Sequence, residues 1–474
     1  MSATTINSDD LIRDIANISC GQYELFFSET RIREFSFDKE NQIPYRSKEI
    51  VASGTSISVL EDGAGGYASI GGSQIRCNVS GLVRMALSSA HISKNHTSSQ
   101  IQYNMRSTDY EMFPTRTGKF TDHESFSEDL ENTDLESASS LIKNILSLRK
   151  QETPKIFGKL QIISDERRIV NSGGGDFSRS SNHFVIRVSQ KLPSSEFENA
   201  YSMGRELDFD RISKIFDTFE NSKNSEGFRN APSGVMDIVL SQAAFSAIIL
   251  ESFFRYMRIM LREAGTVTDP RGELVSDPAL SITVDPLLLA GLCSRKWDDH
   301  GCDCIPKQVV SRGILKDFIS DHVTSSYRGI ACSGNGFRSN CLPKTMMSNI
   351  DLPFLSAALV SPTNIIVSSE NVSENVVQNV QEGVFISSVS EPFARFGKTV
   401  FRCYGSRRIK QGSLEERVNQ TFLIFPDMLA PLQRITMATK STSGFQVICP
   451  EVLMEKVEIR SDIQPEPCSM PCTI

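Results

Sequence analysis

A long helical segment in the second half of the chain most constrains the fold. Residues 242–265 read QAAFSAIILESFFRYMRIMLREAG, Ser241 before them is a suitable N-cap, and Gly265 is suited to end the helix. The first half of this segment is apolar on all sides rather than along one stripe. That pattern predicts burial on every side, so we expect one long buried helix with other elements packed around it.

Strand patterns dominate the rest of the chain. Residues 47–70 alternate apolar and polar side chains around the turn-forming stretch EDGAGG and predict a hairpin, and residues 79–93 follow with helical spacing. Beyond residue 350 the chain consists mostly of short β runs, among them NIIVS, GVFISSV, TVFRCY and KVEI. We therefore predict an α+β fold, with an N-terminal α/β region followed by a strand-rich C-terminal domain.

The length of 474 residues is too great for one ordinary core and predicts two or three domains. Residues 121–140 are dense in Asp, Glu and Ser and predict either a solvated connector or the start of a helix. Residues 221–234 are rich in Asn, Ser and Gly and mark a boundary. The predicted division is a hairpin-plus-helix region at 1–120, a second α/β subdomain at 121–230, a strand-rich domain at 231–465 and a flexible tail at 466–474.

Composition excludes some classes of function. A net charge of −7 and a sequence pI near 5.6 argue against nucleic acid as the main partner. No apolar run reaches the roughly 18 residues that a membrane helix needs, so no membrane partner is expected. The N-terminal residues lack the pattern of a secretory signal, and the eleven cysteines show no repeated pairing. We expect a cytoplasmic protein with mostly free thiols.

The stretch KWDDHGCDC, residues 296–304, has the composition of a metal site. A small zinc site would use His300, Cys302 and Cys304. In an extended segment, however, alternate residues share a face but lie roughly 6.5–7 Å apart, which makes it difficult for both sulfurs to reach one ion. We favour a structural turn at this position and keep the zinc site as the alternative.

Several stretches, in order along residues 50–460, resemble the TldD/PmbA family. They are SGTSISVLEDGAGGYAS, DERRIVNSGGG, APSGVMDIVL, the run from DPLLLAGLCSRKWDDHGCDC to ILKDFISD with SGNGFR after it, and FRCYGSRRIKQGSLEERVN. The resemblance implies a TldD/PmbA-like α+β fold. It also implies that residues 298–301 occupy an Asp-rich turn of the family, which agrees with the structural interpretation.

Catalytic TldD-type members of the family resemble zinc metallopeptidases with a helical His-Glu-x-x-x-His motif. The aligned positions here are Leu250, Glu251 and Arg255, so both histidines are absent. Leucine has no lone pair and arginine is a permanent cation. The resemblance thus implies no catalytic residue and no metal in this chain. Glu251 has two interpretations: an ion pair with Arg255 at i,i+4, or a residual acid/base or substrate-anchoring carboxylate.

The resemblance is to the metal-free PmbA (TldE)-type subunit. It implies a heterodimeric peptidase in which a TldD-type partner holds the zinc, and an extended peptide substrate, either unfolded or a modified precursor. Gly334, Asn335, Gly336 and Arg338 are the candidate wall of a peptide cleft. Two alternatives remain open: an active peptidase or amide hydrolase with a rebuilt site, and a homodimeric peptide-binding scaffold.

Overall fold

The computed structural model forms two compact units, each built from several segments of the chain. Unit 1 contains Met1–Asp217, Val284–Lys307 and Phe318–Ile365, and unit 2 contains Thr218–Thr283, Gln308–Asp317 and Ile366–Ile474. The structure describes residues 21–38, 46–61, 64–72, 79–95, 116–147, 156–191, 197–210, 212–213, 232–262, 269–289, 291–338, 352–390, 392–395, 397–418, 421–441 and 446–461. The predicted tail at 466–474 therefore lies outside the described residues.

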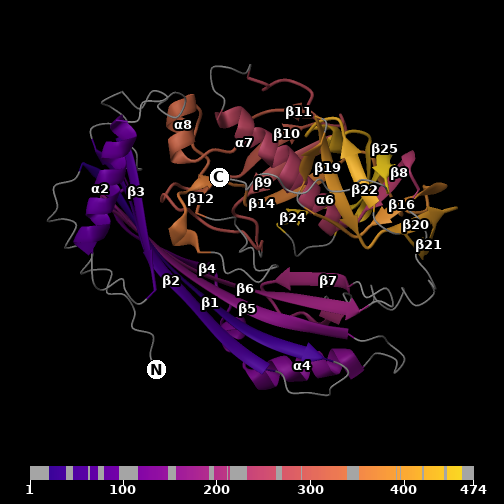
Figure 1. Ribbon diagram of the computed structural model, residues 1–474, viewed down its shortest axis with the longest axis horizontal. Helices are drawn as coiled ribbons and strands as arrows, with labels where there is room; N and C mark the ends of the chain where they lie inside the picture. Colours follow the sequence, from indigo (N-terminus) through magenta and orange to yellow (C-terminus); the bar gives the residue numbers. More distant parts are fainter. Residues whose placement is uncertain are drawn as a thin grey trace. The chain divides into compact units, whose positions relative to one another are not determined.

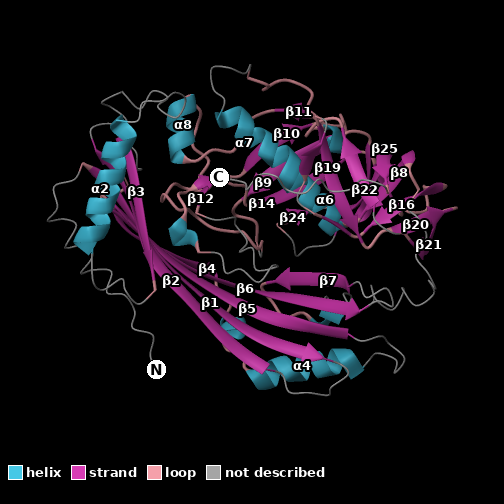
Figure 2. Ribbon diagram, in the orientation of Figure 1, coloured by secondary structure: helices cyan, strands magenta, loops and turns pink. Residues whose placement is uncertain are grey.

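Unit 1 is built on a seven-stranded sheet (Figure 1) with the order β3-β2-β1-β5-β6-β4 and with β7 also paired to β6. The strands are β1 (Gln22–Asp38), β2 (Arg46–Glu61), β3 (Ala64–Gly71), β4 (Gly118–Ser125), β5 (Ile156–Asn171), β6 (Gly175–Lys191) and β7 (Phe197–Gly204). β2 and β3 form the predicted hairpin in antiparallel register. Figure 2 shows how long β1, β5 and β6 are relative to the strands of unit 2.

The alternation of side chains along β1 gives the sheet two different faces. Leu25 and Phe27 point to one face, where the predicted helix, α2 (Val79–Asn95), covers the sheet. Phe26 points to the other face and packs with Trp297 and Phe354, which come from the two later segments of unit 1. Those segments thus cover the face opposite α2.

Shorter elements complete unit 1. They are α3 (Glu128–Glu131), α4 (Leu135–Ser147), α8 (His322–Arg328), the 3-10 helix η4 (Pro353–Leu355) and the two-stranded ribbon of β12 (Gly336–Phe337) and β13 (Leu359–Val360). Ser127 caps α3, because its side chain accepts a hydrogen bond from the backbone N–H of Leu130 at 3.4 Å.

The domain division differs from the predicted one. β4 spans the proposed boundary at residue 120 and pairs in parallel with β6, so residues on both sides of the boundary share one sheet. The connector interpretation of the acidic segment is wrong, because its polar residues mask a pairing with partners more than 50 residues away. The alternative, a helix start, is confirmed, since α3 and α4 both begin within this segment. Residues 284–307 and 318–365 were placed in the C-terminal domain, yet they belong to unit 1.

Unit 2 contains an eleven-stranded sheet and a five-stranded sheet. The larger sheet has the path β17-β19-β22-β25-β8-β16-β20-β21, and its strands are β8 (Gly234–Leu240), β15 (Val372–Ser373), β16 (Glu382–Ile386), β17 (Ser388–Val389), β18 (Phe393–Arg395), β19 (Lys398–Tyr404), β20 (Arg407–Lys410), β21 (Ser413–Arg417), β22 (Thr421–Phe425), β23 (Ile435–Ser441) and β25 (Pro450–Arg460). The smaller sheet, in the order β11-β10-β9-β14-β24, contains β9 (Leu280–Asp285), β10 (Lys307–Ser311), β11 (Ile314–Leu315), β14 (Asn364–Ser369) and β24 (Val447–Ile448). A 3-10 helix, η5, spans Ala430–Leu432.

The predicted long helix is confirmed, with a change of helix type in its middle. It runs as α6 (Gln242–Ile248), the π-helix η2 (Ile249–Phe253) and α7 (Phe254–Arg262). Ser241 is the N-cap, since its hydroxyl oxygen accepts the backbone N–H of Ala244 at 3.2 Å. The α6 part is largely buried, whereas α7 exposes one side to solvent. The α+β class with a strand-rich C-terminal domain is confirmed. Among the described residues no helix is long and apolar enough to cross a membrane.

Candidate functional site

The positions aligned with the family's metal motif lie where the long helix changes type. Leu250 and Glu251 belong to the π-helix, and Arg255 lies in the first turn of α7. The backbone N–H of Phe254 donates to the carbonyl of Ile249, which is the i→i+5 bond of a π-helix. Residues five apart are therefore close to one face at this point, so Leu250 and Arg255 keep the relative placement that a five-residue motif requires.

The side chains at these positions do not fit a zinc ion. Zinc sites use nitrogen, sulfur or oxygen lone pairs, which Leu250 does not have, and Arg255 is a permanent cation. Glu251 is half-buried and Arg255 is exposed. Across the part of the chain that the structure describes, no group of three or more His, Cys, Asp or Glu side chains is placed to hold a metal ion. The Glu251–Arg255 ion pair stays a prediction.

The stretch KWDDHGCDC forms a tight turn that Asp298 organises from within. One carboxylate oxygen accepts the backbone N–H groups of His300 and Cys302, both at 3.0 Å, and the other accepts the N–H of Gly336 at 2.8 Å. Gly301 adopts a φ of +82°, a conformation that glycine reaches without strain. Burial raises the pKa of Asp298 to about 7, against the opposing effects of His300 and these amides.

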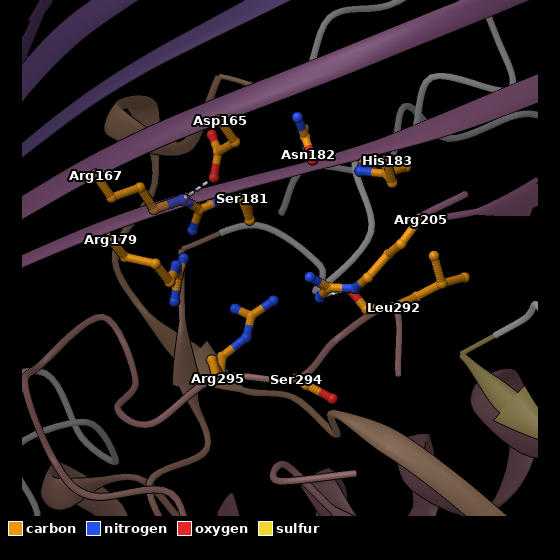
Figure 3. Close-up of a pocket in the computed structure, with 10 residues that line it drawn as sticks. All are labelled: Asp165, Arg167, Arg179, Ser181, Asn182, His183, Arg205, Leu292, Ser294 and Arg295. Carbon is orange, nitrogen blue, oxygen red and sulfur yellow. Dashed lines mark hydrogen bonds and ion pairs between the residues drawn. The ribbon is translucent and has the colours of Figure 1, made fainter. Parts of the chain in front are cut away.

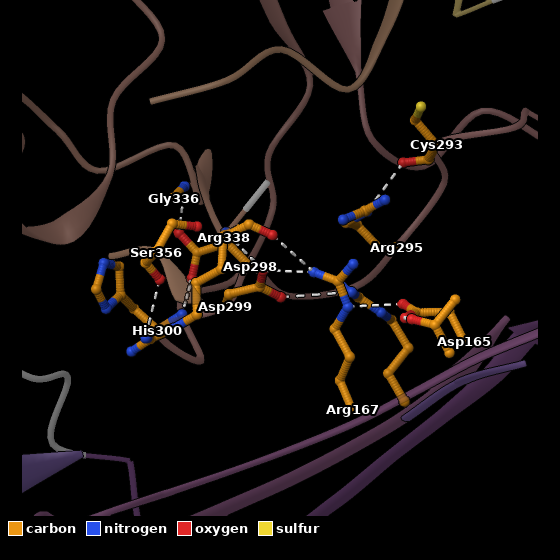
Figure 4. Close-up of polar contacts among 12 residues, drawn as sticks. Asp165, Arg167, Cys293, Arg295, Asp298, Asp299, His300, Gly336, Arg338 and Ser356 are labelled. Atoms are coloured by element: carbon orange, nitrogen blue, oxygen red, sulfur yellow. Dashed lines mark hydrogen bonds and ion pairs between the residues drawn. The ribbon is translucent and has the colours of Figure 1, made fainter. Parts of the chain in front are cut away.

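Asp299, the next residue, is fully buried and forms ion pairs with arginines from two strands. Its carboxylate lies 2.7 Å from Nη1 of Arg167 on β5, and it accepts the backbone N–H of Arg338 at 2.8 Å (Figure 4). It also lies 3.4 Å from Nη2 of Arg179 on β6. Burial alone would raise the pKa of Asp299, but the guanidinium groups lower it below its ordinary value. Asp299 is thus an ionised anchor between the turn and the sheet.

His300 completes the same network through a carboxylate from β1. Its Nδ1 lies 2.9 Å from Oε2 of Glu24, and the other oxygen of Glu24 pairs with Arg338. Arg338 also donates to the hydroxyl of Ser56 at 2.8 Å and lies with its guanidinium carbon 4.6 Å from the centre of the Phe26 ring. Burial would lower the pKa of His300, but Glu24 outweighs it and the pKa rises to about 9. His300 is therefore a buried cation near neutral pH.

The three ligands of the alternative zinc site have separate partners. His300 pairs with Glu24, the thiol of Cys302 is hydrogen-bonded with that of Cys332, and Sγ of Cys304 donates to the carbonyl of Gly334 at 2.9 Å. This geometry gives the zinc alternative no support. The turn interpretation accounts for each conspicuous side chain of the stretch.

The four candidate cleft residues lie together beside this turn, and all four are buried. Gly334 has a φ of +64° and packs against the backbone of Asp303 and Cys304. Asn335 donates from Nδ2 to the carbonyl of Ser361 at 3.1 Å. These contacts brace the turn within unit 1. The peptide-wall role of these residues stays a prediction, because the contacts described here are all internal.

The sequence interpretation missed Glu24, Arg167 and Arg179, which supply most of the charge of the network. Glu24 carried the clearest signal, because it is an isolated carboxylate within the strand pattern QYELFF. In the first part of β1, Glu24 and Phe26 face the turn, while Leu25 and Phe27 face α2. The strand phase therefore could have placed Glu24 on the face away from the helix, although not its partners.

Comparisons with known proteins agree with this fold. Residues 233–461 match the family model described as the PmbA/TldA metallopeptidase C-terminal domain. An uncharacterized protein of Methanocaldococcus jannaschii is 24% identical over 226 residues, which are 47% of this chain and 49% of that protein. The matched region thus spans about half the length of that curated relative.

Three solved structures are similar over nearly the whole chain. TldE from Thermococcus kodakarensis has a TM-score of 0.71 at 14% identity, covering 95% of this chain and 99% of that one. A putative modulator of DNA gyrase from Thermotoga maritima gives 0.69 at 18%, covering 96% and 99%. A second putative modulator of DNA gyrase, from Bacteroides thetaiotaomicron, gives 0.70 at 12%, covering 97% and 100%.

Proposed function

Because this chain is a member of the TldD/PmbA family, we propose that it is the non-catalytic subunit of a heterodimeric TldD/TldE-type zinc metallopeptidase. In this proposal the partner chain supplies the zinc site. The substrate is an extended peptide, either an unfolded chain or a modified precursor. This chain completes the chamber in which the partner cleaves the peptide.

The motif helix is the observation that carries the proposal. Its π-helical turn keeps the five-residue spacing of the motif, yet the two positions at that spacing are Leu250 and Arg255. A catalytic zinc ion needs three protein ligands and an open position for water. A helix with one carboxylate and a neighbouring cation does not provide them, so hydrolysis is assigned to the partner.

The sheet of unit 1 supports the peptide-binding part of the proposal. β3 lies at one end of the strand order and pairs with β2 alone among the described strands. An extended peptide can add to such an edge through backbone hydrogen bonds, which are tolerant of sequence. Affinity from the backbone suits a complex that acts on many unfolded or precursor peptides.

The test is to purify the chain alone, a TldD-type subunit from the same organism alone, and the two mixed. Zinc is measured by elemental analysis, and cleavage is followed on an unfolded peptide. The proposal expects a stable one-to-one complex, zinc only with the partner, and cleavage that needs the mixture. Tightly bound zinc together with peptidase activity in this chain alone would favour the active enzyme with a rebuilt site. A homodimer that does not bind the TldD-type subunit would favour the peptide-binding scaffold.

A further inference from the structure

A groove follows the outer edge of the unit 1 sheet, between β3 and α2, which Figure 1 shows lying beside each other. Its volume is about 500 Å³, within the roughly 300–1,000 Å³ of typical ligand sites. Tyr67 and Ala68 of β3 form one side of this groove, and five residues of α2, Met85 and Ile92 among them, form the other. We call this space the edge groove.

A second cavity of unit 1, shown in Figure 3, is far smaller. Arg179, Arg205 and Arg295 are among the side chains that surround it. Its volume of about 20 Å³ leaves room for about one water molecule. That cavity therefore suits solvent, whereas the edge groove has room for the side chain of a ligand.

Close packing at Gly66 holds α2 against the edge strand. A Cβ at this glycine would lie 2.0 Å from the carbonyl oxygen of Ala86 and 2.7 Å from the backbone nitrogen of Ala90. The backbone of the helix thus rests directly on β3, and the face of α2 that contains Ala86 and Ala90 is buried. Met85 and Ile92 are two helical turns apart, so both lie on the neighbouring face, along the groove.

The apolar side chains on this neighbouring face are exposed. Met85 is 62% exposed and Ile92 is 58% exposed. Contiguous exposed apolar surface on a folded protein marks a place where a partner binds. Arg84 is the one charged residue of the described lining, and the rest of the lining is apolar or carries hydroxyl groups. The edge groove therefore suits a partner with apolar side chains.

The backbone of β3 indicates which kind of partner fits. The N–H of Gly72 donates to the carbonyl of Ser53 at 2.9 Å, and the hairpin register continues from this bond. Bonds in an antiparallel pair join every second residue, so Ala68 bonds to β2 while the backbone groups of Tyr67 and Ser69 point away from it. Within the described part of the chain, β2 is the only strand that pairs with β3. The outward groups are the donors and acceptors that a further strand requires.

We propose that the edge groove binds an extended peptide, which pairs with Tyr67 and Ser69 as a further strand and places an apolar side chain against Met85 and Ile92. A helical partner would satisfy its own backbone groups and leave those of β3 unpaired, so the edge favours an extended chain. The backbone bonds provide affinity for any sequence, and the groove selects apolar residues at alternate positions. This inference rests on the proposed function for its substrate class and adds where the peptide is held.

The binding experiment uses the full chain alone and a short fluorescein-labelled peptide in which leucine alternates with threonine. Fluorescence anisotropy should show saturable binding. Two matched peptides separate the contributions to binding: one has serine in place of each leucine, and the other has N-methylated backbone nitrogens. Each should bind at least about tenfold more weakly, because the first lacks the apolar contact and the second lacks the strand donors.

Variants on α2 locate the site. Met85→Glu should weaken binding of the leucine peptide by about tenfold or more, because it replaces an apolar contact with a charge. His91→Glu is the matched control, since His91 is also exposed on α2 but does not line the groove. It should bind the peptide as the unchanged chain does. If Met85→Glu fails to fold, Ile92→Glu tests the same contact.

Three results would overturn the proposal. One is equal binding of the leucine and serine peptides, and another is equal binding by Met85→Glu and His91→Glu. The third is a dimer of this chain that Met85→Glu dissociates and that binds no peptide. A second copy of the chain would then be the occupant of the edge groove.

Cleavage in the mixture with the TldD-type subunit separates this inference from the proposed function. Normal cleavage by the mixture, with no peptide binding to this chain alone, would refute the edge groove and leave the subunit role intact. Peptide binding to this chain that Met85→Glu weakens, with no cleavage by the mixture, would refute the subunit role and leave the edge groove intact.

Discussion

Nδ1 of His300 lies 2.9 Å from Oε2 of Glu24, although the two residues are 276 positions apart in the chain. Both side chains are buried, and Arg338 occupies the other oxygen of the carboxylate. The contact joins the first strand of unit 1 to a turn in its second segment. It makes the conspicuous histidine of the turn a structural cation.

The stability of unit 1 should fall as the pH rises through about 9, and His300 should be the cause. Its folded-state pKa of about 9 lies above the ordinary value of 6.5, so its stabilising contribution is complete below about pH 6.5 and is lost as the pH rises through 9. The difference corresponds to roughly 3 kcal/mol. Urea unfolding followed by the fluorescence of Trp297, the single tryptophan, measures this dependence.

His300→Gln provides the control for that pH dependence. Asp298, with a pKa raised to about 7, also loses its contribution as the pH rises, but over a lower range. The comparison therefore belongs between about pH 8 and pH 10. The variant should have a much flatter profile in this window, and an unchanged slope would show that another group is responsible.

Asp299→Asn should destabilise unit 1 strongly. The change leaves Arg167 and Arg179 buried beside a neutral amide, and breaking a buried pair costs roughly 3–5 kcal/mol. Asp303→Asn is the matched control in the same turn, because the side chain of Asp303 is 65% exposed and pairs with Arg116. It should cost at most about 1 kcal/mol. Equal losses in the two variants would contradict the anchoring role of Asp299.

Gly334→Ala should be far more damaging than Gly329→Ala. Both glycines have a positive φ, +64° and +62°, so both changes carry the backbone strain of about 1 kcal/mol. A Cβ at Gly334 would also lie 2.3 Å from the carbonyl oxygen of Asp303, whereas nothing lies within 4 Å at Gly329. The excess loss should be about 1–3 kcal/mol. Thermal unfolding measures the stability loss of each variant. Similar losses would mean that the backbone around Gly334 moves enough to accommodate the added Cβ.

Cys332 should react with iodoacetamide faster than Cys302, Cys403 and Cys449, whose pKa values are raised. The thiol of Cys302 donates a hydrogen bond to it and lowers its pKa, and Cys332 is only partly buried. Burial raises the pKa of Cys403 and raises that of Cys449 to about 12. Mass spectrometry at about pH 7.5 should show labelling at Cys332 at least roughly tenfold faster than at Cys403 or Cys449.

Cys302→Ala tests the cause of that reactivity. Removal of the donor should raise the pKa of Cys332 and slow its labelling, while Cys449 stays unchanged. Faster labelling of Cys332 in the variant would mean that access, and not the hydrogen bond, controls the reaction.

Local patterns predicted much of the fold. The alternation along residues 47–70 identified the hairpin of β2 and β3, and Ser241 marked the start of the long helix correctly. These features depend on neighbours within a few residues, which the sequence displays directly. The π-helical turn within that helix gave no separate signal, because its apolar residues suit either helix type.

The site was less predictable, because its contacts are distant in sequence. Asp299 meets Arg167 across 132 positions, and Glu24 meets Arg338 across 314. A composition such as DDHGCDC does not reveal whether its charges meet a metal or buried arginines. The predicted domain boundary at residue 120 is wrong for a similar reason. It cuts β4, whose partner strand β6 lies more than 50 residues later in the chain.

Two glutamates in the reconstituted peptidase distinguish the catalytic chain from the non-catalytic one. Glu251→Gln in this chain is mixed with the unchanged TldD-type partner, and the unchanged chain is mixed with a partner that carries the same change in its zinc-motif glutamate. We expect cleavage within about twofold of normal in the first mixture and a loss of at least about a hundredfold in the second. Loss of cleavage with Glu251→Gln, in a complex that still assembles, would contradict a non-catalytic role for this chain.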